Sequence, residues 1–442
     1  MRPFYFILKF TLAYSLRVQF RRITSRNAPK KYGNQSILVL NHPSSFMDPL
    51  VVSEMQKPIV FFMTRSDVFK PSIKWFLWMV HMLPIYRARD GQGAVEKNEQ
   101  VFKACHEIVK GGRSVLIFGE GLTDDKFVRR LKPVKKGTAR IAFGAMERYN
   151  WDFDLKIQCV GINYENPWKL RTSAIICNSE PIHVRDYQEV YDENPNLAIV
   201  KLTEEVENRL KDQVVHVEEY DWCDTHENIL QFTRKGMNHE SHDSRLSLDE
   251  RQKYSKDLAN YLNEMDEEET SNFLSLKKRL DKYFRVLKRV GLEHEQVYEL
   301  EKKGKLSTAK HWMHVLFGWP LFIMGCIHMG IPYLITKKFV EGKMKRPVFW
   351  SSVKMILGKF IGGIYNLIFI WAFYHMVYES WWLAIVYYIA APGNFFIYAH
   401  YYKRLFKDLL VRNKINKMDT SAFVTRFKEL NQEVEDFVPK SI

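Results

Sequence analysis

The sequence predicts an α/β domain followed by a helical membrane domain. Between residues 33 and 220, short apolar runs alternate with amphipathic stretches, which is the pattern of helices that cover a sheet. Three long apolar segments lie near the end of the chain, and each is long enough to cross a bilayer. The net charge of +15 over 442 residues indicates an anionic partner: a membrane surface, nucleic acid or a phosphorylated substrate.

Composition excludes several other classes of protein. Glycine (21 residues) and proline (16 residues) are too few for a collagen-like or low-complexity chain, and a hydrophobic content of 46% is too high for a disordered one. The five cysteines are scattered and contain no Cys-x-x-Cys pair, so we expect neither a disulfide scaffold nor a structural zinc site. This usage is typical of a reducing, cytosolic environment for the soluble part.

The beginning of the chain is basic and apolar. Residues 1–32 contain eight basic residues and no acidic one. The apolar run of residues 4–16 is interrupted by Lys9, and it is too short to predict a membrane span. We therefore interpret 1–32 as a basic, aromatic, membrane-associated helix that lies in the interface. The alternative is an N-terminal helix that packs on the protein's own core.

Residues 33–220 hold the predicted α/β domain. Strands are predicted at Ser36–Leu40, 58–63, Ser114–Phe118, 156–162 and 173–177. Helices are predicted at 45–56, 68–80, 94–110, 136–148 and 194–214. Gly111 and Gly112 end one of these helices just before a strand begins, which is typical of tightly connected α/β units.

The rest of the chain is predicted to be helical. Its first part is rich in Lys, Glu, Asp and Leu and has few turn residues, so we expect a charged helical connector. A membrane domain of two or three hydrophobic helices follows, and then a basic, helical tail. The predicted boundaries are 221–310 for the connector, 311–402 for the membrane domain and 403–442 for the tail.

The topology of the first apolar segment, residues 313–336, conflicts with the distribution of charge. Basic residues precede it, follow it, and also follow the last apolar segment. The positive-inside rule places all three groups on one side of the membrane, which a single crossing by 313–336 forbids. We therefore expect Gly318-Trp319-Pro320 and Gly330-Ile331-Pro332 to bend this segment into a re-entrant or in-plane hairpin, with two crossings supplied by 355–402.

The segment directly after the strand Ser36–Leu40 carries the strongest chemical signal. It contains His42 and, six residues later, Asp48. An imidazole titrates near neutral pH, so His42 is suited to take a proton from a substrate alcohol. A carboxylate that returns to the imidazole would fix its tautomer and stabilise its charged form. The alternative is structural, because Ser45-x-x-Asp48 is also a capping box for the next helix.

Three other segments carry weaker signals for binding an anion. Glycines 119 and 121, on either side of Glu120, let the backbone approach a ligand closely. Lys135, Lys136 and Gly137 open a helix, and lysines beside a glycine at a helix N-terminus suit a phosphate. Between these and His42 lie Arg87 and Arg89, either of which can hold a phosphate by two hydrogen bonds.

Taken in this order, the segments resemble the glycerophosphate acyltransferase family typified by bacterial 1-acylglycerol-3-phosphate acyltransferase (PlsC-like). Residues 41–48 match its first motif, and Tyr86-Arg87 resembles the end of its second. Residues 118–123 are similar to its Phe-Pro-Glu-Gly motif, although Gly119 replaces the proline. Lys135-Lys136-Gly137 resembles the basic turn that follows, and residues 161–164 a variant of the fourth motif.

The resemblance implies an acyltransferase domain with a central mixed sheet flanked by helices. It also implies that His42 and Asp48 are catalytic. The substrate-binding residues expected from it are Arg87, Glu120, Gly121, Thr123, Lys135, Lys136 and Gly137. The acyl donor would be a thioester, acyl-CoA or acyl-acyl-carrier protein, and neither a metal nor a dissociable cofactor is expected.

The expected function is therefore that of a membrane-bound O-acyltransferase in phospholipid synthesis. Its expected acceptor is 1-acylglycerol-3-phosphate, with glycerol-3-phosphate or the hydroxyl of an aminolipid as alternatives. A rival from another class is a non-enzymatic membrane protein that uses its basic residues to hold anionic lipid.

The location of the excess charge favours a membrane lipid over nucleic acid as the anionic partner. Residues 1–32, 337–346 and 401–412 carry net charges of +8, +4 and +3, and all three flank the predicted membrane segments. We accordingly expect an integral membrane protein whose catalytic domain faces the cytoplasm.

Overall fold

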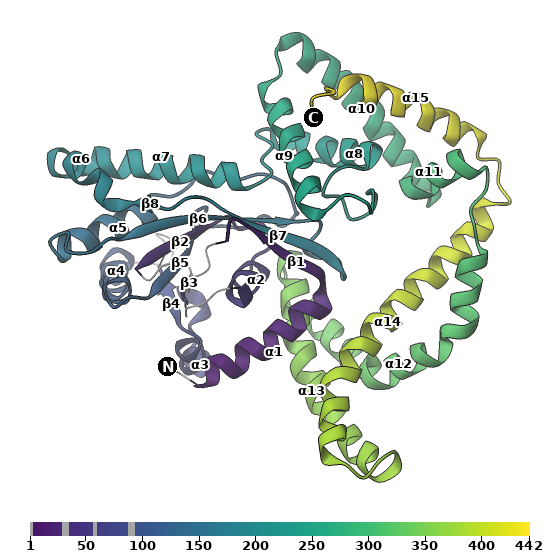
Figure 1. Cartoon of the computed structure of the whole chain (residues 1–442), viewed down its shortest axis with the longest axis horizontal. Coiled ribbons are helices and arrows are strands. Elements are labelled where there is room, and N and C mark those ends of the chain that lie inside the picture. Colours follow the sequence, from purple (N-terminus) through teal and green to yellow (C-terminus); the bar gives the residue numbers. More distant parts are fainter. Residues whose placement is uncertain (1–2, 29–34, 56–59, 87–92) are drawn as a thin grey trace. The chain divides into compact units, whose positions relative to one another are not determined.

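A computed structural model describes residues 3–28, 35–55, 60–86 and 93–442 (Figure 1). They divide into two units, which are described separately. The α/β unit contains Phe20–Pro167, Thr172–Tyr220 and the start of the chain as far as Leu16. The helical unit contains Asp221–Ile442 together with two short segments, Arg17–Gln19 and Trp168–Arg171.

The α/β unit is built on an eight-stranded mixed sheet with the order β1-β7-β6-β2-β5-β3-β4, in which β8 pairs with β6. The pairs around the central strand β2 are parallel, while β6 runs antiparallel to β7 and β8. This confirms the central mixed sheet. The strands are Phe20–Arg26 (β1), Ser36–Leu40 (β2), Val60–Arg65 (β3), Met82–Ile85 (β4), Ser114–Phe118 (β5), Lys156–Tyr164 (β6), Thr172–Asn178 (β7) and Ile182–His183 (β8).

Helices flank this sheet. All five residues of β2 are buried, and Ile37 and Val39 face the hydrophobic core formed with α4, α5 and α7. The helices of the unit are Pro3–Gln19 (α1), Met47–Met55 (α2), Pro71–Met79 (α3), Ala94–Lys110 (α4), Gly137–Arg148 (α5), Gln188–Glu193 (α6) and Pro195–Gln213 (α7), with short 3-10 helices at Ser66–Val68 and Val184–Tyr187. The five helices predicted between 45 and 214 are present within a few residues of their expected bounds.

The first 32 residues differ from the single helix expected. Helix α1 ends at Gln19, and Phe20–Arg26 form the edge strand β1, which pairs parallel with β7. Phe20 is buried while Arg21 and Arg22 are exposed, as an edge strand allows. The α/β unit was expected to start at residue 33, but it begins earlier in the chain.

The helical unit has one hydrophobic core built from two distant parts of the chain. The helices around this core are Cys223–Thr233 (α8), Leu248–Glu264 (α9), Glu267–Val290 (α10), His294–Lys303 (α11) and Ser421–Phe437 (α15), with a 3-10 turn at Tyr220–Trp222 before α8. Phe427, Leu430 and Val434 of α15 are buried in the same cluster as Leu280 and Leu287 of α10. The expected tail is thus a part of this core and not a separate segment.

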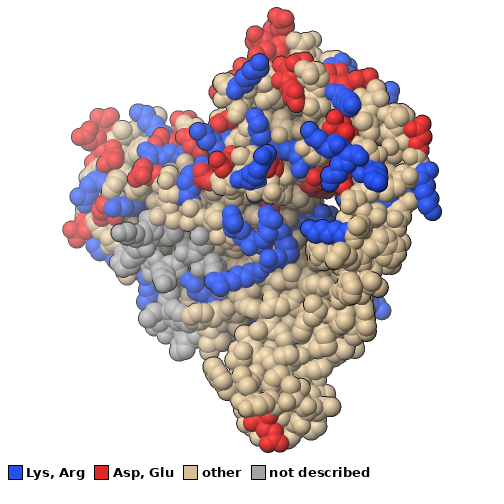
Figure 2. Space-filling model, turned by 45° about the vertical axis from the view of Figure 1, so that its right-hand side comes forward, with Lys and Arg blue, Asp and Glu red and all other residues tan. Residues whose placement is uncertain are grey.

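Three helices are long and apolar enough to cross a membrane, counted over the described residues. They are Ala309–Lys343 (α12), Trp350–Met376 (α13) with the 3-10 turn Pro347–Phe349 before it, and Trp381–Ile415 (α14). In Figure 2 the lower lobe is almost free of charged side chains except at its acidic tip. Glu379, between α13 and α14, is the only acidic residue in 347–407. These features confirm helices suited to a membrane domain.

The hairpin expected at 313–336 is not formed. Helix α12 is continuous from Ala309 to Lys343 and contains Pro320 and Pro332 in its interior. Each proline lacks a backbone N–H and clashes with the preceding turn, so it bends a helix without ending it. The ribbon of α12 changes direction along its length (Figure 1), which is the effect that the two prolines predict.

Candidate active site

His42 lies two residues beyond the end of β2, at the carboxyl ends of the parallel strands β2 and β5. Its imidazole stacks on the ring of Phe118, the last residue of β5, with 3.9 Å between ring centroids and 20° between planes. Asn41 fixes the backbone just before it, because its amide exchanges two hydrogen bonds with the backbone of Ile162 on β6 (2.8 and 3.0 Å). The end of β2 is therefore held from both neighbouring strands.

The structure brings His42 and Asp48 into contact. His42 Nδ1 lies 2.9 Å from Asp48 Oδ2, and the Asp48 side chain is fully buried while that of His42 is 18% exposed. Ser45 has a positive φ of 56°, in the turn that brings α2, and with it Asp48, back toward the imidazole. Within the described residues, His42 Nε2 makes no hydrogen bond, so this nitrogen is available to a substrate.

Asp48 accepts hydrogen bonds from two further donors. The backbone N–H of Ser44 donates to Oδ2 and the hydroxyl of Tyr164 donates to Oδ1, both at 2.9 Å. Burial raises the pKa of the Asp48 carboxyl, while His42 and these two donors lower it. The donors thus offset the cost of burying the charged form. The expected alternative, a capping role for Asp48, does not account for a carboxylate that contacts the imidazole.

Glu120 holds the backbone beside the imidazole. Its Oε1 accepts the His42 N–H at 2.5 Å, its Oε2 accepts the Lys132 N–H at 3.2 Å, and Lys132 Nζ lies 3.8 Å from Oε2. Burial raises the pKa of Glu120, and its contacts with His42 and Lys132 lower it. Glu120 therefore positions the loop that carries His42, a role that the sequence did not indicate.

Gly119 and Gly121 lie on either side of Glu120, and the structure favours a glycine at each position for a different reason. A Cβ at Gly119 would lie 3.2 to 3.4 Å from the side chains of Val39 and Val134, so this turn packs closely on β2 and on the segment before α5. The Gly119 N–H donates to Leu40 O, and Gly119 O accepts the N–H of Lys135. Gly121 has φ +71°, a conformation that favours glycine.

The other residues predicted to bind substrate differ in their exposure, and some of them lie outside the described residues. Lys135 and Lys136 are exposed just before α5, which begins at Gly137, and the Lys135 Cγ lies 3.7 Å from where a Cβ on Gly121 would be. The turn that contains Lys135 and Lys136 therefore lies beside the turn that contains Gly121. Thr123 is buried. Arg87 and Arg89 lie outside the described residues.

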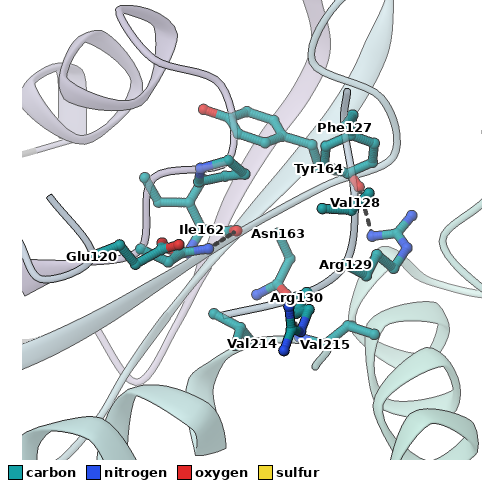
Figure 3. Close-up of a pocket in the computed structure, with 12 residues that line it drawn as sticks. Glu120, Phe127, Val128, Arg129, Arg130, Ile162, Asn163, Tyr164, Val214 and Val215 are labelled. Atoms are coloured by element: carbon teal, nitrogen blue, oxygen red, sulfur yellow. Dashed lines mark hydrogen bonds between the residues drawn. The ribbon is translucent and has the colours of Figure 1, made fainter. Parts of the chain in front are cut away.

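A pocket next to the loop that carries His42 contains two arginines that were not singled out from the sequence (Figure 3). Arg129 donates to Tyr164 O at 2.9 Å. The Arg130 Nε is buried and has no hydrogen-bond partner among the described residues. The pocket is lined by Asn41, Pro43, Glu120, Phe127, Val128, Arg129, Arg130, Ile162, Asn163, Tyr164, Val214 and Val215. It offers positive charge beside Pro43, which follows His42 in the loop after β2, and beside Glu120.

The arrangement is that of a general base without a protein nucleophile. His42 has a buried acid on Nδ1 and an open Nε2, which suits removal of a proton from a substrate hydroxyl. Over the part of the chain that the structure describes, no group of three or more His, Cys, Asp or Glu side chains is placed to hold a metal ion.

A comparison with protein families indicates the type of reaction that the α/β unit supports. Residues 19–163, which contain β1, His42, Asp48 and the Glu120 turn, match the family model described as Acyltransferase. Residues 19–163 form an acyltransferase domain. The match begins at residue 19, in agreement with the finding that β1 belongs to the α/β unit. It confirms the acyltransferase family expected from the motifs.

Two further comparisons concern solved structures and curated sequences. The structure is similar to the crystal structure of the 1-acyl-sn-glycerophosphate (LPA) acyltransferase PlsC from Thermotoga maritima, with 17% sequence identity and a TM-score of 0.32. That similarity covers 45% of this chain and 76% of the other. A search of curated protein sequences finds no match.

Proposed function

We propose that this acyltransferase moves a fatty acyl group from an acyl thioester to the free hydroxyl of 1-acylglycerol-3-phosphate, as a step of phospholipid synthesis. The observation that carries the proposal is the pair formed by His42 and the buried Asp48, 2.9 Å apart, with Nε2 of the imidazole open. A base of this kind activates an alcohol, and an alcohol is the acceptor in O-acyl transfer.

In the proposed step, His42 Nε2 takes the proton of the acceptor hydroxyl as its oxygen attacks the thioester carbonyl. A C–O bond forms, and the tetrahedral intermediate then loses the thiolate when the C–S bond breaks. The imidazolium returns its proton to the departing sulfur, so the products are an ester and a free thiol. Asp48 accepts the hydrogen bond from Nδ1–H and stabilises the imidazolium while it exists. Neither a metal nor a dissociable cofactor takes part.

The phosphate of the acceptor is proposed to lie among the cations near the Gly121 turn. Lys135 and Lys136 are exposed at the start of α5, where the backbone N–H groups of a helix also favour an anion. Arg87 is proposed as a further phosphate ligand from the resemblance alone. In this proposal Glu120, Gly121 and Thr123 shape the acceptor site around the backbone contacts described above.

The donor is proposed to be acyl-CoA or acyl-acyl-carrier protein, and the α/β unit is proposed to face the cytoplasm. Support for that side comes from the basic residues before α13 (337–346) and in the last part of α14 (401–412), which two crossings by α13 and α14 place on one side, because cytoplasmic segments carry the excess of Lys and Arg. The single acidic residue in 347–407, Glu379, lies in the turn between α13 and α14 and would face the other side.

Incubation of the purified full-length chain with each acceptor and a labelled acyl thioester tests the proposal. The acceptors are 1-acylglycerol-3-phosphate, glycerol-3-phosphate and an aminolipid with a free hydroxyl, each offered with acyl-CoA and with acyl-acyl-carrier protein. We expect the label to appear in a diacylglycerol phosphate. Transfer only to glycerol-3-phosphate or to the aminolipid would contradict the proposed acceptor.

A further inference from the structure

Helix α3 presents aromatic side chains to the outside of the α/β unit. Trp75 and Trp78 are each 61% exposed and Ile73 is 40% exposed, while Leu77 is the buried residue of this helix. Residues three apart lie on one face of a helix, so the two indoles share a surface. Soluble surfaces rarely expose large apolar groups together, and such a cluster marks a site of interaction.

The start of α1 extends this surface. Ile7 and Phe10 are also three residues apart, and they are 62% and 77% exposed. Tyr5, on the opposite face of α1, is buried, and its ring stacks on His81 with a centroid distance of 4.9 Å. Since His81 follows α3 directly, the start of α1 lies beside α3 (Figure 1). Both helices thus turn apolar side chains outward at one edge of the unit.

The charge next to α3 identifies the partner as a bilayer surface. Lys70 and Lys74 are exposed, and the one acidic residue in 66–81, Asp67, is paired with Arg65. Tryptophans beside exposed lysines suit the boundary between acyl chains and anionic headgroups, where indoles sit and ammonium groups meet phosphate. In a symmetric contact with a second copy of the chain, residues 66–81 would offer the lysines only Asp67, which Arg65 already holds.

We propose that α3, together with the start of α1, is a membrane-docking surface of the α/β unit. Its indoles insert at the level of the headgroups, and Lys70 and Lys74 bind anionic lipid. Because α12, α13 and α14 are long enough to hold the chain in the same membrane, docking needs only weak contacts of its own. It would keep the α/β unit at the leaflet that holds its lipid acceptor.

A fluorescent label tests the depth of α3 directly. The full-length chain carries Cys326→Ser, since the other four cysteines are buried, and a single new cysteine, Trp78→Cys, that is labelled with an environment-sensitive NBD group. In liposomes of phosphatidylcholine and phosphatidylglycerol we expect blue-shifted emission that doxyl lipids quench and aqueous iodide does not. The matched control is Leu197→Cys on α7, where 44% exposure predicts quenching by iodide.

Two results of the labelling experiment would overturn the proposal. The first is a label at position 78 that iodide quenches as well as it quenches the control. The second is a label shielded from both quenchers, which would mean that a protein surface covers α3. Neither result depends on turnover, so the labelling tests docking even if the proposed acceptor is wrong.

The double variant Trp75→Ser, Trp78→Ser tests the consequence for activity, which rests on the proposed function. With acceptor embedded in liposomes we expect turnover to fall on the order of tenfold, the factor that about 1.4 kcal/mol of lost contact produces. With the same acceptor in detergent micelles, turnover should remain at the wild-type level. An equal loss in both systems would indicate damage to the fold and contradict the docking role.

Discussion

The fully buried Asp48 carboxylate has three partners, one of which lies far from it in the sequence. His42 and Ser44 come from the loop after β2, but Tyr164 is 116 residues away at the end of β6. The motif at residues 161–164 includes Tyr164, but the sequence indicates no role for this residue. A hydroxyl that donates to a distant carboxylate leaves no local pattern in the sequence. The parallel pairing of β2 with β6 explains the contact, because it sets the end of β6 beside the loop that follows β2.

Removal of the Tyr164 hydroxyl should slow catalysis and change its pH dependence. In Tyr164→Phe we expect turnover at neutral pH to fall roughly 10- to 100-fold, because a hydrogen bond to a charged group contributes about 1.5–3 kcal/mol. With one donor lost, the pKa of Asp48 rises further, so the carboxylate is protonated and activity is lost at a higher pH than in the wild type. Rate–pH profiles measure both effects.

Tyr187→Phe is the matched control for that experiment, because no contact of the Tyr187 hydroxyl with Asp48 is present in the structure. Its rate–pH profile should coincide with that of the wild type. A Tyr164→Phe enzyme whose acid limb does not move, or moves to lower pH, would contradict the role given to this hydroxyl.

His106 makes the α/β unit sensitive to acid. It lies on α4, is 8% exposed, and neither ring nitrogen has a hydrogen-bond partner among the described residues. Burial, and next the charge of Arg148, lowers its pKa from 6.5 to about 4. The folded state therefore keeps a neutral imidazole that the unfolded chain protonates. Its contribution to stability is complete above pH 6.5 and is lost as the pH falls from 6.5 toward 4.

His106→Leu should weaken this dependence. Between pH 7 and pH 5, the melting temperature of the full-length chain in detergent should fall less in the variant than in the wild type, since a leucine takes up no proton. Thermal unfolding followed at the two pH values measures the difference. Equal falls in the two proteins would show that His106 is not the group that titrates.

At the level of helices and strands, the sequence predicted buried elements better than edge elements. Strands β2 and β5 were predicted at their observed bounds because they are continuous apolar runs. Strand β1 was assigned to a helix, since its three arginines and two apolar residues follow a basic helix and resemble its continuation. Its pairing partner, β7, lies about 150 residues further on, so no local pattern reports the pairing.

A buried polar cluster joins the three membrane helices. His328 of α12 contacts Asn366 of α13 through Nδ1 and Tyr387 of α14 through Nε2, the latter at 2.6 Å. Asn366 also donates to the backbone oxygens of His328 and Gly362 at 2.9 and 2.8 Å. Polar side chains that are satisfied across helices stabilise membrane bundles, so this cluster fixes how the three helices pack.

Asn366→Leu should therefore destabilise the membrane domain. The variant loses two donors and one acceptor at the centre of the bundle, and we expect a loss of about 1–2 kcal/mol, seen as a lower melting temperature in detergent. The matched control is Asn394→Leu, because Asn394 is exposed and donates only within its own helix, to Ala390 O. A control that melts as low as Asn366→Leu would contradict a role for the cluster in packing.

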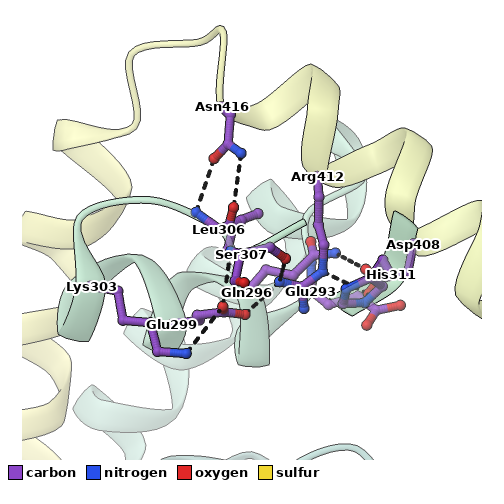
Figure 4. A network of polar contacts seen from close by, with 10 residues as sticks. All are labelled: Glu293, Gln296, Glu299, Lys303, Leu306, Ser307, His311, Asp408, Arg412 and Asn416. Carbon is purple, nitrogen blue, oxygen red and sulfur yellow. Dashed lines mark hydrogen bonds and ion pairs between the residues drawn. The ribbon is translucent and has the colours of Figure 1, made fainter. Parts of the chain in front are cut away.

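At the scale of the whole chain, the helical unit joins its soluble core to the membrane helices through Arg412 (Figure 4). Arg412 lies near the end of α14 and is 9% exposed. It donates to Glu299 of α11 at 2.5 Å and to Asp408 at 2.7 Å, and His311 near the start of α12 contacts the same Asp408 oxygen at 2.9 Å. The expected connector, membrane domain and tail therefore meet at one network, which their separate compositions did not indicate.

Loss of the Arg412 guanidinium should destabilise this junction strongly. Arg412→Met leaves two carboxylates without their shared cation, and breaking such a largely buried pair costs about 3–5 kcal/mol. Arg426→Met is the matched control, because the Arg426–Glu429 pair is exposed on α15 and such pairs contribute about 0–1 kcal/mol. Limited proteolysis between α11 and α12 should be faster in Arg412→Met alone; equal rates would contradict the role of the network.

The central claim is that His42 removes a proton from an acceptor hydroxyl, and one comparison of variants tests it most directly. His183 is a matched control, because its Nδ1 also lies 2.9 Å from a carboxylate, that of Asp154, but this pair is exposed. Acyl transfer to 1-acylglycerol-3-phosphate is measured for His42→Ala and His183→Ala at equal expression and equal melting temperature. We predict that His42→Ala loses transfer and that His183→Ala keeps it. Near-normal transfer by His42→Ala would contradict the account.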